Sequence, residues 1–106
     1  MTAAVSDWET VIEQLEQQSL RLLELARRGD WDTVQAEQPH RQACFESCFA
    51  RPVPAEAAPT VIAGLRRVAA LDERLMELAR QHQDDLGRRL SGINRGRQAQ
   101  AAYRMR

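Results

Sequence analysis

Hydrophobic residues recur every three or four positions through the first part of the chain, the spacing that places side chains on one face of a helix. Ser6 and Glu9 fit the capping box that starts a helix. Gly29 suits the left-handed conformation that ends a helix, and Asp30 can cap the next one. We therefore predict a helix over residues 6–28. The chain then reverses direction at Gly29 and enters a second helix antiparallel to the first. The apolar stripe of the first helix consists of Trp8, Val11, Ile12, Leu15, Leu22, Leu25 and Ala26.

A second helix is predicted over residues 31–50, beginning at Trp31, which lies where it can bridge the two helices of the hairpin. Pro39 lies inside this helix and removes one backbone hydrogen bond, which predicts a kink near residues 35–38. The prolines within residues 51–59 forbid regular helix and predict a linker. The residues that the second helix should bury are Trp31, Val34, Cys44, Phe45, Cys48 and Phe49.

The longest apolar stripe follows this linker and predicts a third helix over residues 60–91. Ser91, Gly92 and Gly96 weaken helix, so we predict a break there and a short, mobile fourth helix over residues 94–105. The stripe of the third helix consists of Val61, Leu65, Val68, Asp72, Leu75, Ala79, His82, Leu86 and Ile93, widened by Ile62, Ala69, Met76 and Leu90.

Together these elements predict an all-α fold, a single domain of three or four helices. At 1.5 Å per residue the first two helices span roughly 30 Å each and the third roughly 45 Å. The last turns of the third helix should therefore pass beyond the hairpin, and they still carry His82, Leu86, Leu90 and Ile93. Such a strip needs the fourth helix, a second subunit or a client protein to cover it.

The formal net charge is zero, but the charges are unevenly distributed. Residues before the linker are net acidic, whereas every charged residue after Asp85 is arginine: Arg88, Arg89, Arg95, Arg97, Arg104 and Arg106. The balanced total argues against direct nucleic-acid binding, for which only Tyr103 would offer stacking near these arginines. No apolar run is long enough for membrane insertion, and the first residues lack the parts of a secretion signal. We expect a cytosolic protein.

Two groups of residues are candidates for chemistry. His40, Cys44 and Cys48 follow each other at four-residue intervals, but the outer two lie about 12 Å apart along a helix, so the three cannot close on one zinc ion. Asp72 interrupts the third apolar stripe, and we interpret it as a half-buried acid that pairs with an arginine such as Arg41. We expect no catalytic residue, no cofactor and no metal site.

Two stretches of sequence carry a resemblance to a known family. The first surrounds the turn and comprises Leu22, Leu23, Leu25, Ala26, Gly29, Trp31, Asp32, Val34, Glu37 and Arg41. The second comprises Leu71, Asp72, Leu75, Leu78, Leu86, Leu90, Ala102 and Tyr103. With these residues in this order, the chain resembles the FliT family of flagellar export chaperones over most of its length.

The resemblance implies a small helical protein of the bacterial cytosol that binds the flagellar filament-cap protein and delivers it to the type III export machinery, including the export ATPase complex. In some enteric bacteria it also implies binding to the flagellar master transcriptional regulator. It implies that a C-terminal regulatory helix covers the client surface, here through Ile93, Ala99, Ala102 and Tyr103. The residues that would bind the partner are Phe45, Phe49, Leu65, Val68, Leu75, Leu86 and Leu90. The alternative is a structural or regulatory coiled-coil protein that forms a homodimer through the same strip.

Overall fold

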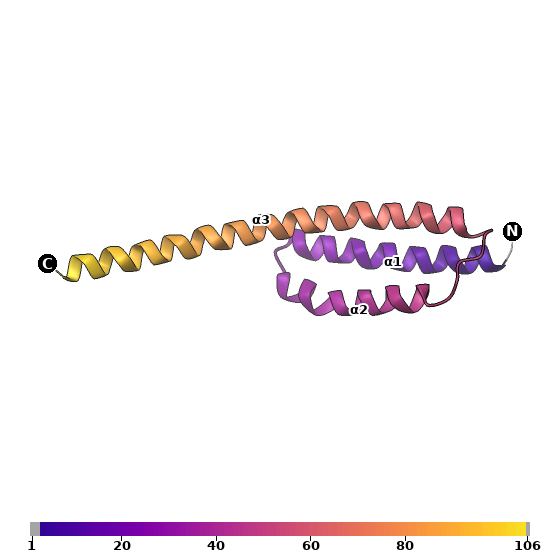
Figure 1. Cartoon of the computed structure of the whole chain (residues 1–106), viewed down its shortest axis with the longest axis horizontal. Coiled ribbons are helices and arrows are strands. Elements are labelled where there is room, and N and C mark those ends of the chain that lie inside the picture. The colour runs from indigo at the N-terminus through magenta and orange to yellow at the C-terminus, as the bar shows by residue number, and fades with distance from the viewer. Residues whose placement is uncertain (1–2, 106) are drawn as a thin grey trace. The chain divides into compact units, whose positions relative to one another are not determined.

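Three α-helices make up the fold in the computed structural model, which describes residues 3–105 (Figure 1). They are α1 (Ala3–Arg27), α2 (Trp31–Phe49) and α3 (Ala58–Arg104), and no strand occurs among the described residues. The all-α prediction is confirmed. The chain divides into two units, Met1–Met76 and Glu77–Arg106, which are described separately. Within the described residues no helix is long and apolar enough to span a bilayer.

The turn between α1 and α2 follows the sequence prediction. Gly29 has a φ of 77°, the left-handed conformation that glycine adopts without strain. The amide of Asp30 donates to the carbonyl of Leu25 (2.9 Å) and that of Gly29 to Ala26 (3.0 Å), which satisfies carbonyls at the end of α1. The carboxylate of Asp30 then accepts from the amide of Thr33 (3.3 Å) and caps α2. These local bonds fix the reversal of the chain.

Helix boundaries differ from the predicted ones for simple physical reasons. α1 begins at Ala3 rather than Ser6, because alanine is the best helix former and lets the first turn extend toward the N-terminus. α2 continues through Pro39 and ends at Phe49. α3 begins at Ala58, two residues before the predicted start, because a proline is tolerated in the first turn, where its missing N–H would have no partner; here that proline is Pro59.

The predicted fourth helix is wrong. α3 runs without a break from Ala58 to Arg104, so the residues assigned to a short helix over 94–105 are its last turns. Gly92 and Gly96 each cost about 1 kcal/mol of helix stability relative to alanine, but no proline or cap follows to end the helix. The surrounding leucine, arginine, glutamine and alanine residues favour helix and outweigh the two glycines.

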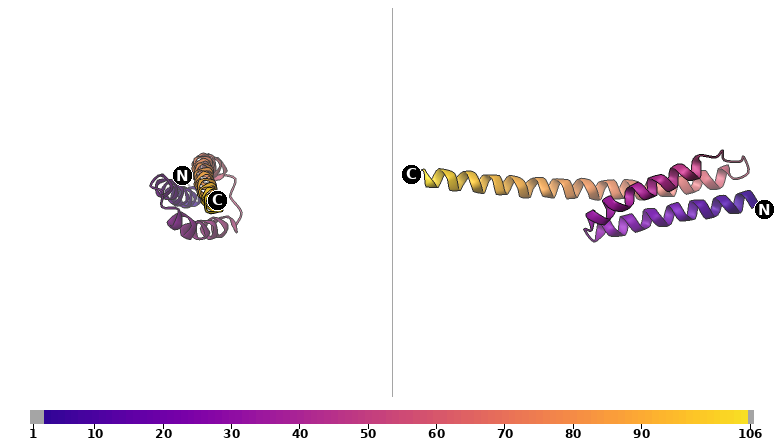
Figure 2. Two further views of the ribbon diagram at one scale, coloured as in Figure 1. Left: turned by 90° about the vertical axis from the view of Figure 1, so that its left-hand side faces the viewer. Right: turned by 90° about the horizontal axis from the view of Figure 1, so that it is seen from below.

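The hydrophobic core lies in the first unit, where α1 packs against the first half of α3 (Figure 2). Its buried members are Trp8, Ile12, Leu15, Ala57, Val61 and Val68. Gly64 allows a close approach of the two helices: a Cβ built on it would lie 2.0 Å from Cγ2 of Ile12. Gly64 was not among the predicted core positions, although a glycine in register with Val61 and Val68 is a signal for close helix contact.

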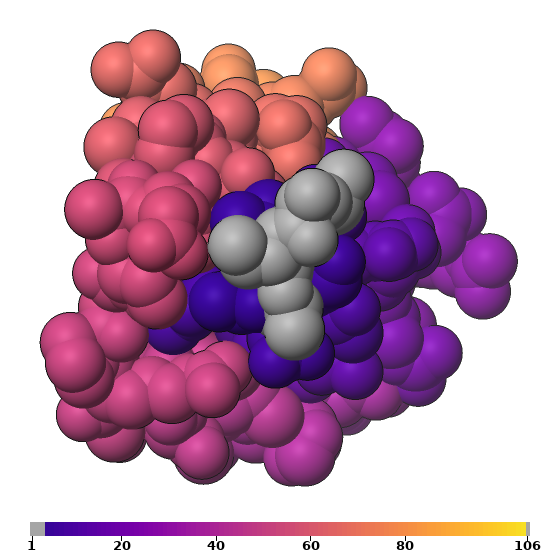
Figure 3. All heavy atoms as spheres, turned by 90° about the vertical axis from the view of Figure 1, so that its right-hand side faces the viewer, coloured from indigo at the N-terminus to yellow at the C-terminus, as the bar shows by residue number. Residues whose placement is uncertain are grey.

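Aromatic residues close one end of this core. The ring of Trp8 is 2% exposed and lies 5.5 Å from that of Phe49, which in turn lies 4.9 Å from the ring of Phe45. The guanidinium of Arg51 sits 4.7 Å above the Trp8 ring, within cation–π range. Figure 3 shows the segment between α2 and α3 lying beside the start of α1. The linker therefore covers the end of the core and does more than connect two helices.

A polar network joins the three helices of the first unit. Arg41 on α2 donates to the carboxylate of Asp72 on α3, as the sequence predicted, and to the hydroxyl of Ser19 on α1 (3.0 Å). Ser19 is buried and donates to the carbonyl of Leu15 (2.9 Å). One guanidinium thus satisfies groups on both neighbouring helices and fixes their register.

The substitution Arg41→Met is expected to destabilise the protein by about 1–3 kcal/mol, because it leaves Asp72 and Ser19 without their shared donor. Urea unfolding followed by circular dichroism measures this change. Adding Asp72→Asn should cost less in the Arg41→Met background than in the wild type. The control is Arg28→Met, which removes an exposed pair with Glu24 and should change stability by less than about 0.5 kcal/mol. Equal effects of both arginine substitutions would contradict a role for the network.

Exposed ion pairs add smaller contributions between the same helices. Arg21 on α1 donates to both carboxylate oxygens of Glu37 on α2, at 2.8–3.0 Å. These hydrogen bonds, helped by the charge of the guanidinium, hold the pKa of Glu37 below its ordinary value. Arg67 on α3 reaches Glu16 on α1 at 2.9 Å. The pKa of Glu37 is lower in the folded protein than in the unfolded chain, so ionised Glu37 stabilises the fold at any pH above its unfolded pKa. This contribution is lost as the pH falls through the pKa of Glu37 in the folded protein.

Candidate functional site

Three large aliphatic side chains on the C-terminal half of α3 face solvent. Leu86 is 42% exposed, Leu90 is 61% exposed and Ile93 is 52% exposed. Because their spacings are four and three residues, they lie above one another on one face of the helix. We call these three residues the exposed strip. An uncovered row of large apolar side chains is a recurrent mark of a binding surface.

The exposed strip continues the face that α3 buries in the first unit. Val61, Val68 and Leu75 are buried and follow each other at seven-residue intervals, which keeps them on one side of the helix. From Leu75, steps of four, three and four residues lead through Ala79 and His82 to Leu86. No described residue after Leu75 is buried. The same apolar face is therefore covered in its first part and open in its second, as the length argument from the sequence anticipated.

The structure distributes the predicted partner-binding residues over three environments. Val68 and Leu75 are 6% and 5% exposed, and a partner reaches neither side chain while the first unit is closed. Phe45, Phe49 and Leu65 are half-buried and pack against the core. Leu86 and Leu90 belong to the exposed strip. The two leucines are thus the members of the predicted set that are open to a partner without rearrangement.

The predicted regulatory tail forms the last turns of α3. Ile93 is part of the exposed strip, and Ala99, Ala102 and Tyr103 are also exposed. At 100° per residue, these last three residues lie on the side of the helix away from the exposed strip. Because α3 is continuous, these residues extend its last turns and form no separate helix.

Arginines are the charged residues on the turns of α3 that follow Asp85. Arg88, Arg89, Arg95, Arg97 and Arg104 are all exposed, and Arg106 lies outside the described residues. Arg89 reaches the carboxylate of Asp85 at 3.1 Å, one turn earlier. Among the described residues of this half of α3, Asp85 is the last acid, so the surface around Leu90 and Ile93 is basic.

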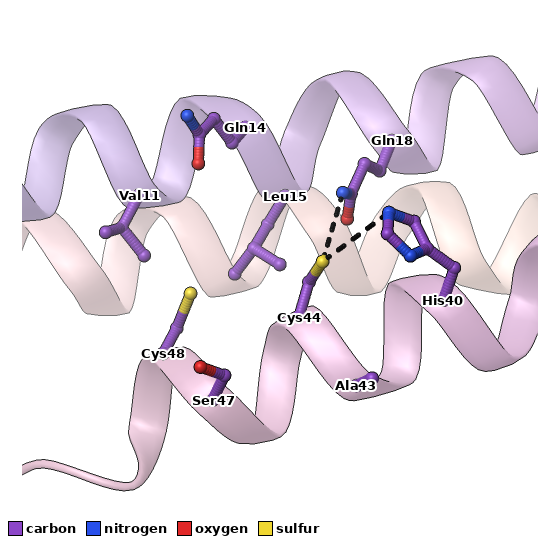
Figure 4. Close-up of a pocket in the computed structure, with 9 residues that line it drawn as sticks. All are labelled: Val11, Gln14, Leu15, Gln18, His40, Ala43, Cys44, Ser47 and Cys48. Carbon is purple, nitrogen blue, oxygen red and sulfur yellow. Dashed lines mark hydrogen bonds between the residues drawn. The ribbon is translucent and has the colours of Figure 1, made fainter.

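A pocket of about 320 Å³ lies between α1 and α2 in the first unit (Figure 4). His40, Cys44 and Cys48 point into it, and the thiol of Cys44 lies 3.8 Å from Nε2 of His40 and 3.6 Å from the side-chain nitrogen of Gln18. Both cysteines are free thiols. Among the described residues no three or more histidine, cysteine or acidic side chains are grouped to hold a metal ion. We therefore interpret the pocket as a gap in the packing between α1 and α2.

A comparison with family models decides what kind of protein carries this surface. The model described as "Flagellar protein FliT" matches residues 9–105, nearly the whole chain. The chain belongs to the FliT family. FliT proteins are flagellar export chaperones and not an enzyme family. The match includes α2, the linker and all but the first residues of α1, as well as the exposed strip and the arginines around it. No curated protein and no solved structure matched the chain.

Proposed function

We propose that this FliT-family protein holds the flagellar filament-cap protein in the bacterial cytosol and delivers it to the type III export machinery. The observation that carries the proposal is the exposed strip on a chain whose family consists of export chaperones. Leu86, Leu90 and Ile93 offer an apolar row about two turns long. That geometry suits a client segment that docks as an amphipathic helix, with side chains at matching three- and four-residue spacing.

The proposal assigns different tasks to different faces of α3. The exposed strip takes the client, and the tail residues Ala99, Ala102 and Tyr103 form a separate regulatory surface. A surface on the far side of the helix stays accessible while the client is bound, so it suits the export ATPase complex or the flagellar master regulator as second partners. In the first unit, the half-buried Phe45, Phe49 and Leu65 pack against the core. We also assign these three residues to the proposed partner-binding set.

The direct test is co-expression with the filament-cap protein encoded in the same genome, followed by size-exclusion chromatography with light scattering. The wild-type chain should give a stoichiometric complex. The double substitution Leu86→Asp/Leu90→Asp should weaken client binding by about tenfold or more, because two carboxylates would have to be desolvated against the apolar face of the client.

The matched control is Gln81→Asp/Ser91→Asp, which adds the same charge at two exposed positions on the other side of the same helix. This control should bind the client within about twofold of the wild type, because surface substitutions away from an interface change little. Circular dichroism should show equal helix content in both variants. Failure of the wild type to co-elute with the cap protein would overturn the proposal. A stable dimer that ignores the cap protein would instead favour the coiled-coil alternative.

A further inference from the structure

Beyond Asp85, which pairs with Arg89, the charges along the exposed strip are all of one sign. Every charged residue after Asp85 is an arginine, whereas residues 1–50 contain nine acidic residues and four arginines. The formal neutrality of the chain therefore conceals a basic segment after Asp85, which lies within the second unit. Surface charge of one sign beside an apolar strip attracts partners of the opposite sign and repels those of the same sign.

Two of these arginines lie where they would meet a helix seated on the strip. Arg97 follows Ile93 by four residues and so continues the same face of α3. Arg89 follows Leu86 by three residues and borders that face. In the part of the chain that the structure describes, Arg97 makes no ion pair, whereas Arg89 pairs with Asp85. By the same rotation of 100° per residue, Arg88 and Arg95 lie on the opposite side.

We propose that the occupant of the exposed strip is an amphipathic helix whose apolar stripe is flanked by aspartate or glutamate, with carboxylates that pair with Arg89 and Arg97. This inference rests on the proposed client-binding function and adds the chemistry of the client. Docking brings the arginine side chains to the rim of an interface that excludes water, where charge pairs strengthen and a cationic partner is repelled. A guanidinium also offers a carboxylate two parallel N–H donors, which gives the pairing a defined geometry.

Three synthetic peptides of equal length test the charge preference. They share one leucine stripe at helical spacing and carry glutamate, glutamine or lysine at every flanking position. Fluorescence anisotropy of each labelled peptide with the full chain gives the affinities. At about 50 mM sodium chloride the glutamate peptide should bind about tenfold more tightly than the glutamine peptide, and the lysine peptide should bind most weakly. At about 300 mM this advantage should largely disappear.

A pair of matched variants locates the effect on one face of the helix. Arg89→Gln/Arg97→Gln should reduce the preference for the glutamate peptide to about twofold or less. Arg88→Gln/Arg95→Gln removes the same charge from the opposite side and should retain most of the preference. Equal losses in both variants would mean that only net charge matters and would overturn the proposed pairing. Equal affinities for the glutamate and glutamine peptides in the wild type would overturn it as well.

Two further outcomes separate this inference from the proposed function. If the filament-cap protein binds and loses affinity in Leu86→Asp/Leu90→Asp but is indifferent to salt and to Arg89→Gln/Arg97→Gln, the acidic-partner inference fails and the chaperone function stands. If the glutamate peptide binds as expected and the cap protein does not, the function fails and the partner chemistry stands. Self-association of the chain that is lost in Arg89→Gln/Arg97→Gln would assign the strip to the acidic surface of a second copy and overturn the proposal.

Discussion

The substitution Gly64→Val is expected to destabilise the protein by about 1–3 kcal/mol or more, the range found when a packed core receives extra methyl groups. The reason is geometric, since even the Cβ would approach Cγ2 of Ile12 to 2.0 Å. α1 and α3 would have to separate, and the contacts of Val61 and Val68 would loosen with them. The measurement is thermal and urea unfolding of the purified variant, followed by circular dichroism.

The chain offers a matched control for this prediction. Gly87→Val places the same side chain on the same helix at a position where a Cβ meets nothing within 4 Å, and its effect should stay within about 0.5 kcal/mol. A second check is the pair Ile12→Ala/Gly64→Val, which should cost less than the sum of its single substitutions because the smaller side chain makes room for valine. A Gly64→Val protein as stable as the Gly87→Val control would show that the two helices do not meet at this point.

The substitution Trp8→Ala is expected to cost about 3–5 kcal/mol, the usual penalty for removing a large buried aromatic side chain. Trp8 is 2% exposed, contacts the ring of Phe49 and supports the guanidinium of Arg51. Its loss opens a cavity at the end of the core and removes the ring against which Arg51 of the linker packs. Because native domains have about 5–15 kcal/mol of stability, this loss is a large share of the total and the unfolding midpoint should fall markedly.

Tyr103→Ala serves as the comparison for Trp8→Ala, since its side chain is 79% exposed and its removal should leave the unfolding midpoint nearly unchanged. Tryptophan fluorescence adds an independent readout, because Trp8 should move from an apolar to a wet environment when the wild type unfolds. Wild-type stability in Trp8→Ala would mean that the aromatic cluster contributes little to the fold.

The parts of the fold that the sequence predicted well depend on local chemistry. Gly29 and Asp30 determine the turn through bonds to residues within five positions, so their side chains alone were sufficient evidence. The pairing of Arg41 with Asp72 was predictable because an acid inside an apolar stripe needs a partner. The fourth helix failed for the opposite reason. Gly92 and Gly96 weaken helix only slightly, and no proline or capping residue follows them. The free energies of continuing and of ending the helix there are therefore close.

The candidate site was only half predictable for a related reason. Helical spacing shows which residues share a face, and the helix lengths predicted an uncovered end, but neither excluded Val68 and Leu75 from the predicted partner-binding set. Val68, Leu75, Leu86 and Leu90 belong to one stripe in the sequence, yet the first two are buried and the last two are open. The close contact at Gly64 depends on two helices that are distant in sequence, so its meaning emerged only from the packed structure.

The unequal burial along α3 has a thermodynamic consequence for recognition. Its first half is held by side-chain packing, whereas the turns after Leu75 rely on backbone hydrogen bonds and local propensity, which leave a helix only marginally stable in water. These turns should fray often, and amide protons there should exchange with solvent sooner than those opposite Ile12. A ligand on Leu90 would also suppress this fraying. Ordering the helix costs free energy, which lowers the observed affinity of the ligand. The lower affinity favours release of the cargo.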